Sequence, residues 1–193
     1  LPVRDVFLML AAGAFWQIAV IPYYKALAQD DASRIVPLFQ IIPVFVLIFS
    51  SLFINEHLVP KQLLGFLVIL IGSFLLSMKQ LGLRIWELRP SFWLMMLSSF
   101  LYAIPFVILK FVVASGKFWD ALTYEFLGAG IGALILLLLP GYFKIARGEL
   151  TGIPRIGWGV LAVSEGIYTF AKILVFYAVS LTSVSLVAVL GGT

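Results

Sequence analysis

The sequence contains no cysteine and a single histidine, and only 11% of its residues are charged. Without cysteine, the chain has no disulfide, no thiolate metal ligand and no cysteine nucleophile. Its acids are also sparse: Asp30 and Asp31 are the one adjacent acidic pair, and they lie in a predicted turn. Metal-dependent and triad-based enzymes need several such groups close together. The composition therefore argues against an enzyme, and we predict no metal and no cofactor.

Two further absences narrow the function. The chain has neither the G-x-x-x-x-G-K-[ST] loop nor a post-strand G-x-G-x-x-G motif, so it shows no adenine-nucleotide site. Any transport would therefore draw on a gradient or on exchange. Lysine and arginine occur singly between apolar runs, as interfacial anchors do, and we predict no nucleic-acid partner.

Long apolar runs fill the rest of the chain, which is 63% hydrophobic. A soluble domain of this size cannot bury so much apolar surface, whereas a membrane span needs about 20 such residues. We predict six complete spans, at 6–28, 33–54, 60–79, 91–114, 120–141 and 155–179. A seventh begins near Ser183 and stops at Thr193. The short polar links between spans indicate an all-α, polytopic transmembrane helix bundle, multi-pass in the cell (plasma) membrane and surrounded by its lipids.

The two ends of the chain indicate a fragment of a longer protein. The sequence opens on Leu-Pro-Val-Arg rather than Met, and the seventh apolar run is too short to cross. A shift of 152 residues also aligns 15–38 with 167–190. Both segments consist of a helix that ends in alanine, a polar link with serine, and a second helix. Such repeats favour a transporter whose site lies between two halves.

One stretch carries a family resemblance. "KALAQDDASRIVPLFQIIPVFVLIFSSLFINEHLVPKQLLGFLVILIGSFLLS" (25–77) resembles the second part of an EamA domain, from the drug/metabolite transporter superfamily. The positions that match its pattern are Lys25, Ala26, Ser33, Pro43, Glu56, Gly65 and Gly72. The resemblance implies a two-repeat transporter of five helices each. Residues 1–80 would hold the last three helices of the first repeat, and residues 81–193 the first helices of the truncated second repeat.

The function implied by this resemblance is secondary transport of small metabolites. We expect an exporter of amino-acid-like or drug-like compounds, driven by a gradient or by exchange. The alternative is a membrane-embedded protein without transport, either a lipid-modifying enzyme or a scaffold. The substrate, the coupling ion and the oligomeric state stay open. Orientation is open too, because the positive-inside rule places the link at 28–33 in the cytoplasm and the resemblance implies the reverse.

Polar residues form a stripe on the sixth predicted span. Glu165, Tyr168, Thr169 and Lys172 follow at i, i+3, i+4 and i+7, on one helix face. A charge at mid-span costs about 2.5–3.5 kcal/mol on insertion scales. The stripe therefore favours a substrate site, with Lys172 for a carboxylate or phosphate and Glu165 for an amine or a coupling proton. The structural alternative is an ion pair, such as Lys172 with Glu125. If Lys172 is functional, Lys172→Met should insert normally and transport poorly.

The same cavity would have a second wall. The 152-residue shift aligns Trp16 and Gln17 with the polar stripe, and Gln40 lies one turn before Pro43. Pro43 would leave the Phe39 carbonyl without a helical partner and kink the second span. We therefore predict Trp16, Gln17 and Gln40 as substrate-binding residues, with core packing as the alternative.

Small residues predict where helices touch. Gly128 and Gly132 form a G-x-x-x-G face on the fifth span, and Gly65 and Gly72 share one face of the third. Small residues let helix backbones approach in lipid, so we read both pairs as packing faces.

Overall fold

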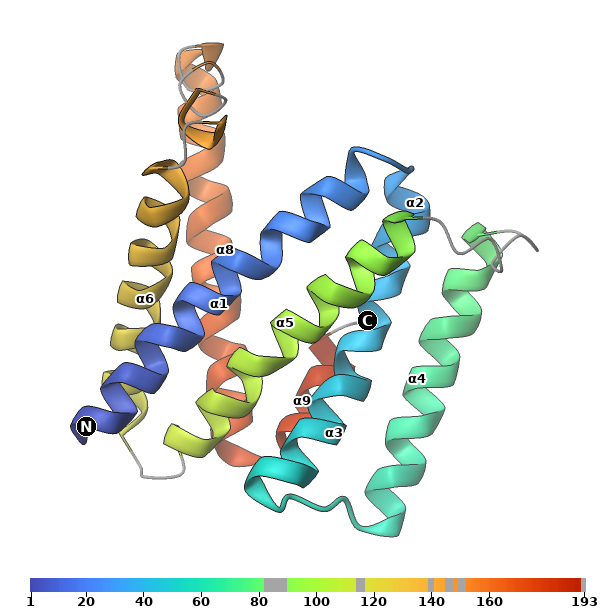
Figure 1. The fold of residues 1–193 in the computed structure, drawn as a ribbon. Helices are drawn as coiled ribbons and strands as arrows, with labels where there is room; N and C mark the ends of the chain where they lie inside the picture. Colours follow the sequence, from blue (N-terminus) through green and yellow to red (C-terminus); the bar gives the residue numbers. More distant parts are fainter. Residues whose placement is uncertain (82–89, 114–116, 139–140, 145–147, 149–151, 192–193) are drawn as a thin grey trace.

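The computed structural model describes residues 1–81, 90–113, 117–138, 141–144, 148 and 152–191, and every regular element in these ranges is a helix. The elements are α1 (Val3–Leu27), α2 (Ala32–Ile35), the 3₁₀ helix η1 (Val36–Ile41), α3 (Ile42–Ile54), α4 (Pro60–Leu81), α5 (Pro90–Val113), α6 (Phe118–Leu138), α8 (Arg155–Leu181) and α9 (Val184–Gly191). The all-α prediction is confirmed (Figure 1).

Four of these helices, α1, α5, α6 and α8, are long and apolar enough to cross a membrane. Two further apolar segments, Leu38–Ile54 and Pro60–Gly72, belong to the stretch η1–α3 and to α4, and α4 itself continues to Leu81. The predicted count of six complete spans is therefore not confirmed.

The second predicted span is not one continuous helix, which corrects the prediction for 33–54. It is divided into α2, η1 and α3, and Pro43 is the second residue of α3. At the start of a helix the missing proline N–H costs nothing, because that donor has no intrahelical partner. The Phe39 carbonyl accepts the Ile42 N–H, so it is not left free as we had expected.

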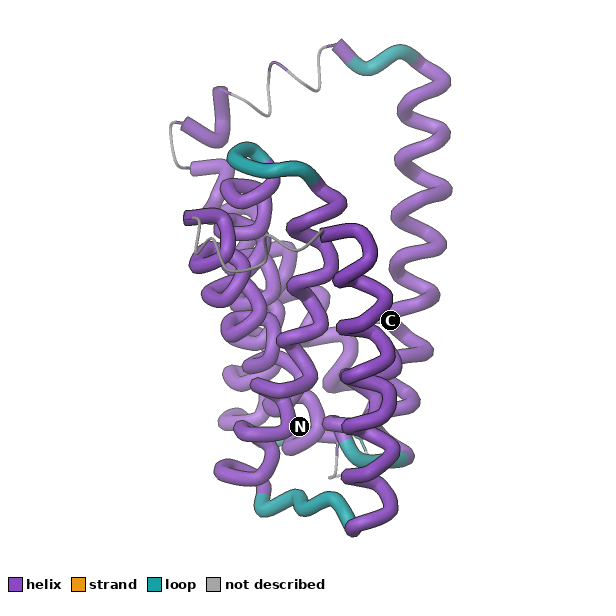
Figure 2. Tube along the Cα trace, turned by 90° about the vertical axis from the view of Figure 1, so that its right-hand side faces the viewer, coloured by secondary structure: helices purple, strands orange, loops and turns teal. Residues whose placement is uncertain are grey.

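The bundle is organised around α1 (Figure 1). Its two main packing partners are α5 and α6, and α3 packs against α5 and α9. The main core fills the space between these helices with residues such as Met9, Val46, Val112 and Val179. In contrast, the N-terminal half of α8 stands apart from the bundle (Figure 2), and most of its side chains are exposed.

Glycines set the crossing of α1 and α6. A Cβ on Gly13 would collide with the backbone of α6, and a Cβ on Gly128 would collide with the backbone of Leu10. Gly132 faces Ala14, 3.0 Å from where its Cβ would lie. The predicted G-x-x-x-G packing face is thus present. At Gly65 and Gly72, by contrast, no atom of the described residues lies within 4 Å of a Cβ position, so the packing face predicted there is not seen.

Candidate functional site

A buried ion pair joins α8 to α6. The Lys172 Nζ donates to the Glu125 Oε1 over 2.8 Å, and the two side chains are 6% and 1% exposed. This is the alternative partner that the sequence left open. Both charges lie within apolar helices, where an unpaired charge would be costly to bury. The ion pair avoids this cost because Lys172 and Glu125 neutralise each other.

The position of Glu125 follows from the close crossing of α1 and α6. The backbone carbonyl of Glu125 lies directly against Gly13, where any side chain would collide with it. The contact fixes this turn of α6 against α1. Glu125 is therefore held on a rigid part of the bundle, whereas Lys172 lies on α8, which has fewer neighbours.

Three aromatic rings surround the ammonium group. The Lys172 Nζ lies 4.6 Å from the ring centroid of Trp16, 5.0 Å from that of Phe126 and 5.5 Å from that of Phe176. Ring faces at these distances attract a cation. The lysine thus has stabilising neighbours besides the Glu125 carboxylate, whereas Glu125 has no comparable second set of neighbours among the described residues.

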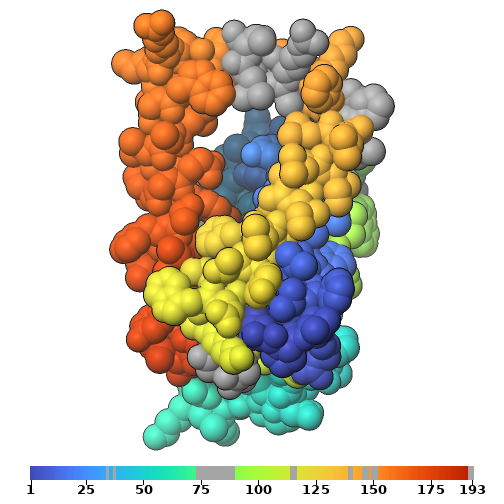
Figure 3. Space-filling model, turned by 90° about the vertical axis from the view of Figure 1, so that its left-hand side faces the viewer, coloured from blue at the N-terminus to red at the C-terminus, as the bar shows by residue number. Residues whose placement is uncertain are grey.

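A cavity of about 240 Å³ opens beside the ion pair. It is lined by Trp16, Ile42, Phe106, Tyr168, Ala171, Lys172, Val175, Phe176 and Ala188. The lining comes from α1, α3, α5, α8 and α9, so the cavity lies where these helices converge. Figure 3 shows a separate open gap, between the separated half of α8 and α6, with α1 behind it.

The structure brings together three of the seven predicted site residues. Trp16, Tyr168 and Lys172 all line this cavity. Trp16 also makes an edge-to-face contact with Tyr102, at 5.2 Å between ring centroids, which holds the indole against α5. Trp16, Tyr168 and Lys172 thus form an aromatic–lysine cluster where α1 meets α8, and its role in binding a substrate stays a prediction.

The other four predicted residues lie elsewhere. Glu165 is exposed, two turns before Lys172 on the separated half of α8, and Thr169 is partly buried on the same helix. Gln17 faces α6: its Cβ lies 3.3 Å from the position that a Cβ on Gly132 would take. Gln40 is part of η1 and is not among the residues that line the cavity. Their binding roles remain predictions.

Sequence reasoning undervalued Glu125 and missed two rings, Phe126 and Phe176. Glu125 appeared only as a structural partner for Lys172, although an acid inside the predicted span at 120–141 carries the same insertion cost as Lys172. This insertion cost is the sequence signal that could have identified Glu125 as a candidate site residue. Nothing in the sequence separates Phe126 and Phe176 from the many other apolar aromatics.

The carboxylate of Glu125 can accept a further hydrogen bond. Within the described part of the chain, its Oε2 is buried and has no hydrogen-bond partner. A buried acceptor without a donor is costly, so this oxygen is a place where a ligand N–H would be favoured. No cluster of three or more metal-ligating His, Asp or Glu side chains occurs among the described residues.

Apolar helices of spanning length, with a buried charge pair beside a cavity, define an integral membrane protein. Residues 2–78 match the family described as the EamA-like transporter family. The match confirms the resemblance that residues 25–77 carry, and it includes Trp16, Gln17 and Gln40.

A curated relative matches part of the chain. It is described as an uncharacterized transporter in the cobO 3′ region of a Sinorhizobium species, and it is 40% identical over 68 residues. The alignment covers 35% of this chain and 45% of that protein, so the chain spans less than half of the relative's length. No solved structure gives a significant match.

Proposed function

We propose that this chain is part of a secondary transporter that moves small metabolites across the cell membrane through the cavity beside Lys172. The observation that carries the proposal is the buried Lys172–Glu125 pair next to that cavity. The EamA-like match and the transporter named among its relatives support the same class. Residues 1–80 and 81–193 would contribute parts of the two repeats.

The charges favour a zwitterionic substrate, such as an amino-acid-like compound. The pair is neutral overall, so a bound anion or cation would leave one buried charge unmatched, at several kcal/mol. A zwitterion avoids this penalty because its carboxylate can pair with Lys172 and its ammonium group with Glu125. Glu125 lies behind Lys172 and does not itself line the cavity, so the ammonium group would reach its unpartnered Oε2 only if the Glu125 side chain turned toward the substrate.

The walls would select for the apolar part of the substrate. Apart from Lys172 and the Tyr168 hydroxyl, the side chains around the cavity are aromatic or aliphatic. Apolar walls with few polar groups are typical of small-molecule sites. An amino-acid-like or drug-like compound with a hydrophobic side group would fit this lining, and we infer export, driven by a gradient or by exchange.

Counterflow in proteoliposomes tests the proposed substrate class. The full-length protein would be reconstituted and offered three radiolabelled sets: hydrophobic amino acids, amines of the same shape without a carboxylate, and carboxylates without an amine. We expect exchange of the amino acids and at most weak exchange of the other two sets. Equal exchange of the carboxylates would contradict the charge-balance argument, and no exchange of any set would contradict the proposed substrate class.

A further inference from the structure

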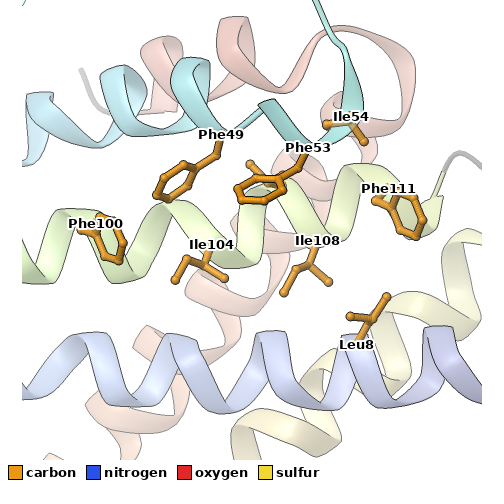
Figure 4. Close-up of a pocket in the computed structure, with 9 residues that line it drawn as sticks. Leu8, Phe49, Phe53, Ile54, Phe100, Ile104, Ile108 and Phe111 are labelled. Atoms are coloured by element: carbon orange, nitrogen blue, oxygen red, sulfur yellow. The ribbon is translucent and has the colours of Figure 1, made fainter. Parts of the chain in front are cut away.

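A second hollow lies on the bundle away from the Lys172 cavity. It has a volume of about 480 Å³, and it follows α5 between α1 and α3 (Figure 4). It is lined by Leu8, Phe49, Phe53, Ile54, Phe100, Ile104, Val107, Ile108 and Phe111. The two hollows share no lining residue in the part of the chain that the structure describes, so this groove is a separate feature of the molecule.

Among the described residues, the groove offers no polar side chain to an occupant. All nine lining residues are leucine, isoleucine, valine or phenylalanine. A polar metabolite would lose its hydration here without gaining a hydrogen bond. A hydrocarbon would lose nothing, and it would gain dispersion contacts with the walls.

Its length matches one leaflet of a bilayer. From Phe111 to Phe100 the groove follows α5 for eleven residues, which is about 16 Å at 1.5 Å per residue. Half of a hydrocarbon core is roughly 15 Å thick. Phe111 lies two residues before the end of α5, and Leu8 lies near the start of α1, so this end of the groove faces the membrane surface.

A basic side chain, that of Arg4, lies at the Phe111 end of the groove. The Arg4 guanidinium lies 5.1 Å from the ring centroid of Phe111, a lining residue of the groove. The Arg4 side chain is 71% exposed, and its Nε pairs with Asp5 over 3.1 Å. A guanidinium has five N–H donors, so it can bind a phosphate while its Nε keeps this contact.

We propose that the groove binds an anionic phospholipid, with one acyl chain along α5 and the phosphate at Arg4. The apolar lining accounts for the acyl chain, the length for its depth, and Arg4 for the headgroup. This site is independent of the transport cavity, and it would attach a lipid to the junction of α1, α3 and α5.

Photocrosslinking identifies the occupant. A benzophenone amino acid would replace Ile104 on the floor of the groove, and in a second protein it would replace Phe53, which is 73% exposed and tolerates a larger side chain. The full-length protein in nanodiscs of equal phosphatidylglycerol and phosphatidylcholine would be irradiated and its adduct masses measured. We expect phosphatidylglycerol adducts at both positions. Crosslinks to a second copy or to another segment of the chain would overturn the proposal.

Matched variants test the role of Arg4. Arg4→Gln should lower the ratio of phosphatidylglycerol to phosphatidylcholine adducts about fivefold, as expected for one basic residue at an anionic surface. Lys117→Gln removes an exposed cation that does not contact the groove, so the ratio should not change. An equal effect of the two substitutions, or no effect of Arg4→Gln, would overturn the headgroup assignment.

Discussion

Breaking the Lys172–Glu125 pair from either side should have unequal effects on stability. The sequence alone predicts that Lys172→Met leaves insertion unharmed, but the structure reverses this expectation because Glu125 is only 1% exposed and would lose its ion-pair partner. Removing one member of a buried pair typically costs about 3–5 kcal/mol. We expect Lys172→Met to lower the free energy of unfolding by about this amount.

Glu125→Gln should cost less. The ammonium group of Lys172 would lose the carboxylate but keep the ring faces of Trp16, Phe126 and Phe176, each worth about 0.5–2 kcal/mol. The double variant Lys172→Met/Glu125→Gln should recover most of the lost stability, since neither charge remains to be buried. The two substitutions would thus be strongly non-additive.

The assay is equilibrium unfolding of the purified protein in mixed micelles, for the wild type, both single variants and the double variant. The ordering expected is wild type and double variant close together, Glu125→Gln below them and Lys172→Met lowest. Additive losses in the double variant would refute the reasoning, because they would mean that the two charges do not interact. Equal losses in the two single variants would refute the role given to the aromatic rings.

Three further predictions concern the packing. Gly128→Val should lower the free energy of unfolding by about 1–3 kcal/mol or more, because any side chain there collides with α1. Gly130→Val, at an open position, should not lower it, and thermal unfolding in detergent compares the two variants. Ser50 and Ser185 share a buried 2.9 Å hydrogen bond between α3 and α9, so a double-mutant cycle with alanine should give a coupling of about 0.6 kcal/mol, and a coupling of zero would contradict the bond. Lys110→Met should speed hydrogen exchange at the end of α8, because the lysine donates to two carbonyls there; unchanged exchange would contradict that cap.

The long helices were predictable because lipid sets their length. The fourth span, predicted at 91–114, is Pro90–Val113, and the sixth, predicted at 155–179, is Arg155–Leu181. A run of apolar residues in a membrane must satisfy its backbone internally, so its extent can be read directly from the sequence. The break inside 33–54 could not be read in the same way. A proline near the start of a helix and a proline inside a kinked helix look alike in sequence. In the structure, η1 ends at Ile41, so Pro43 lies at the start of α3 and not inside a kinked helix.

The site was predictable only in part, since a sequence gives the faces of a helix but not which neighbour each face meets. The four residues of the predicted stripe all lie on α8, and Lys172 among them is buried. Whether Lys172 would pair with a substrate or with Glu125 depended on how α6 and α8 are rotated about their axes. Glu165 shares the face of Lys172, yet it lies where α8 has left the bundle, and a helical pattern carries no information on that separation.

The most direct test of the proposed function is transport by the Lys172→Met/Glu125→Gln double variant of the full-length protein. Amino-acid exchange would be measured in proteoliposomes that hold equal amounts of folded wild-type and variant protein. We expect the variant to insert and remain stable but to lose at least nine-tenths of the exchange rate, because both charges that would bind the zwitterion are gone. Exchange at the wild-type rate would contradict the proposal and leave the ion pair as a purely structural feature of the bundle.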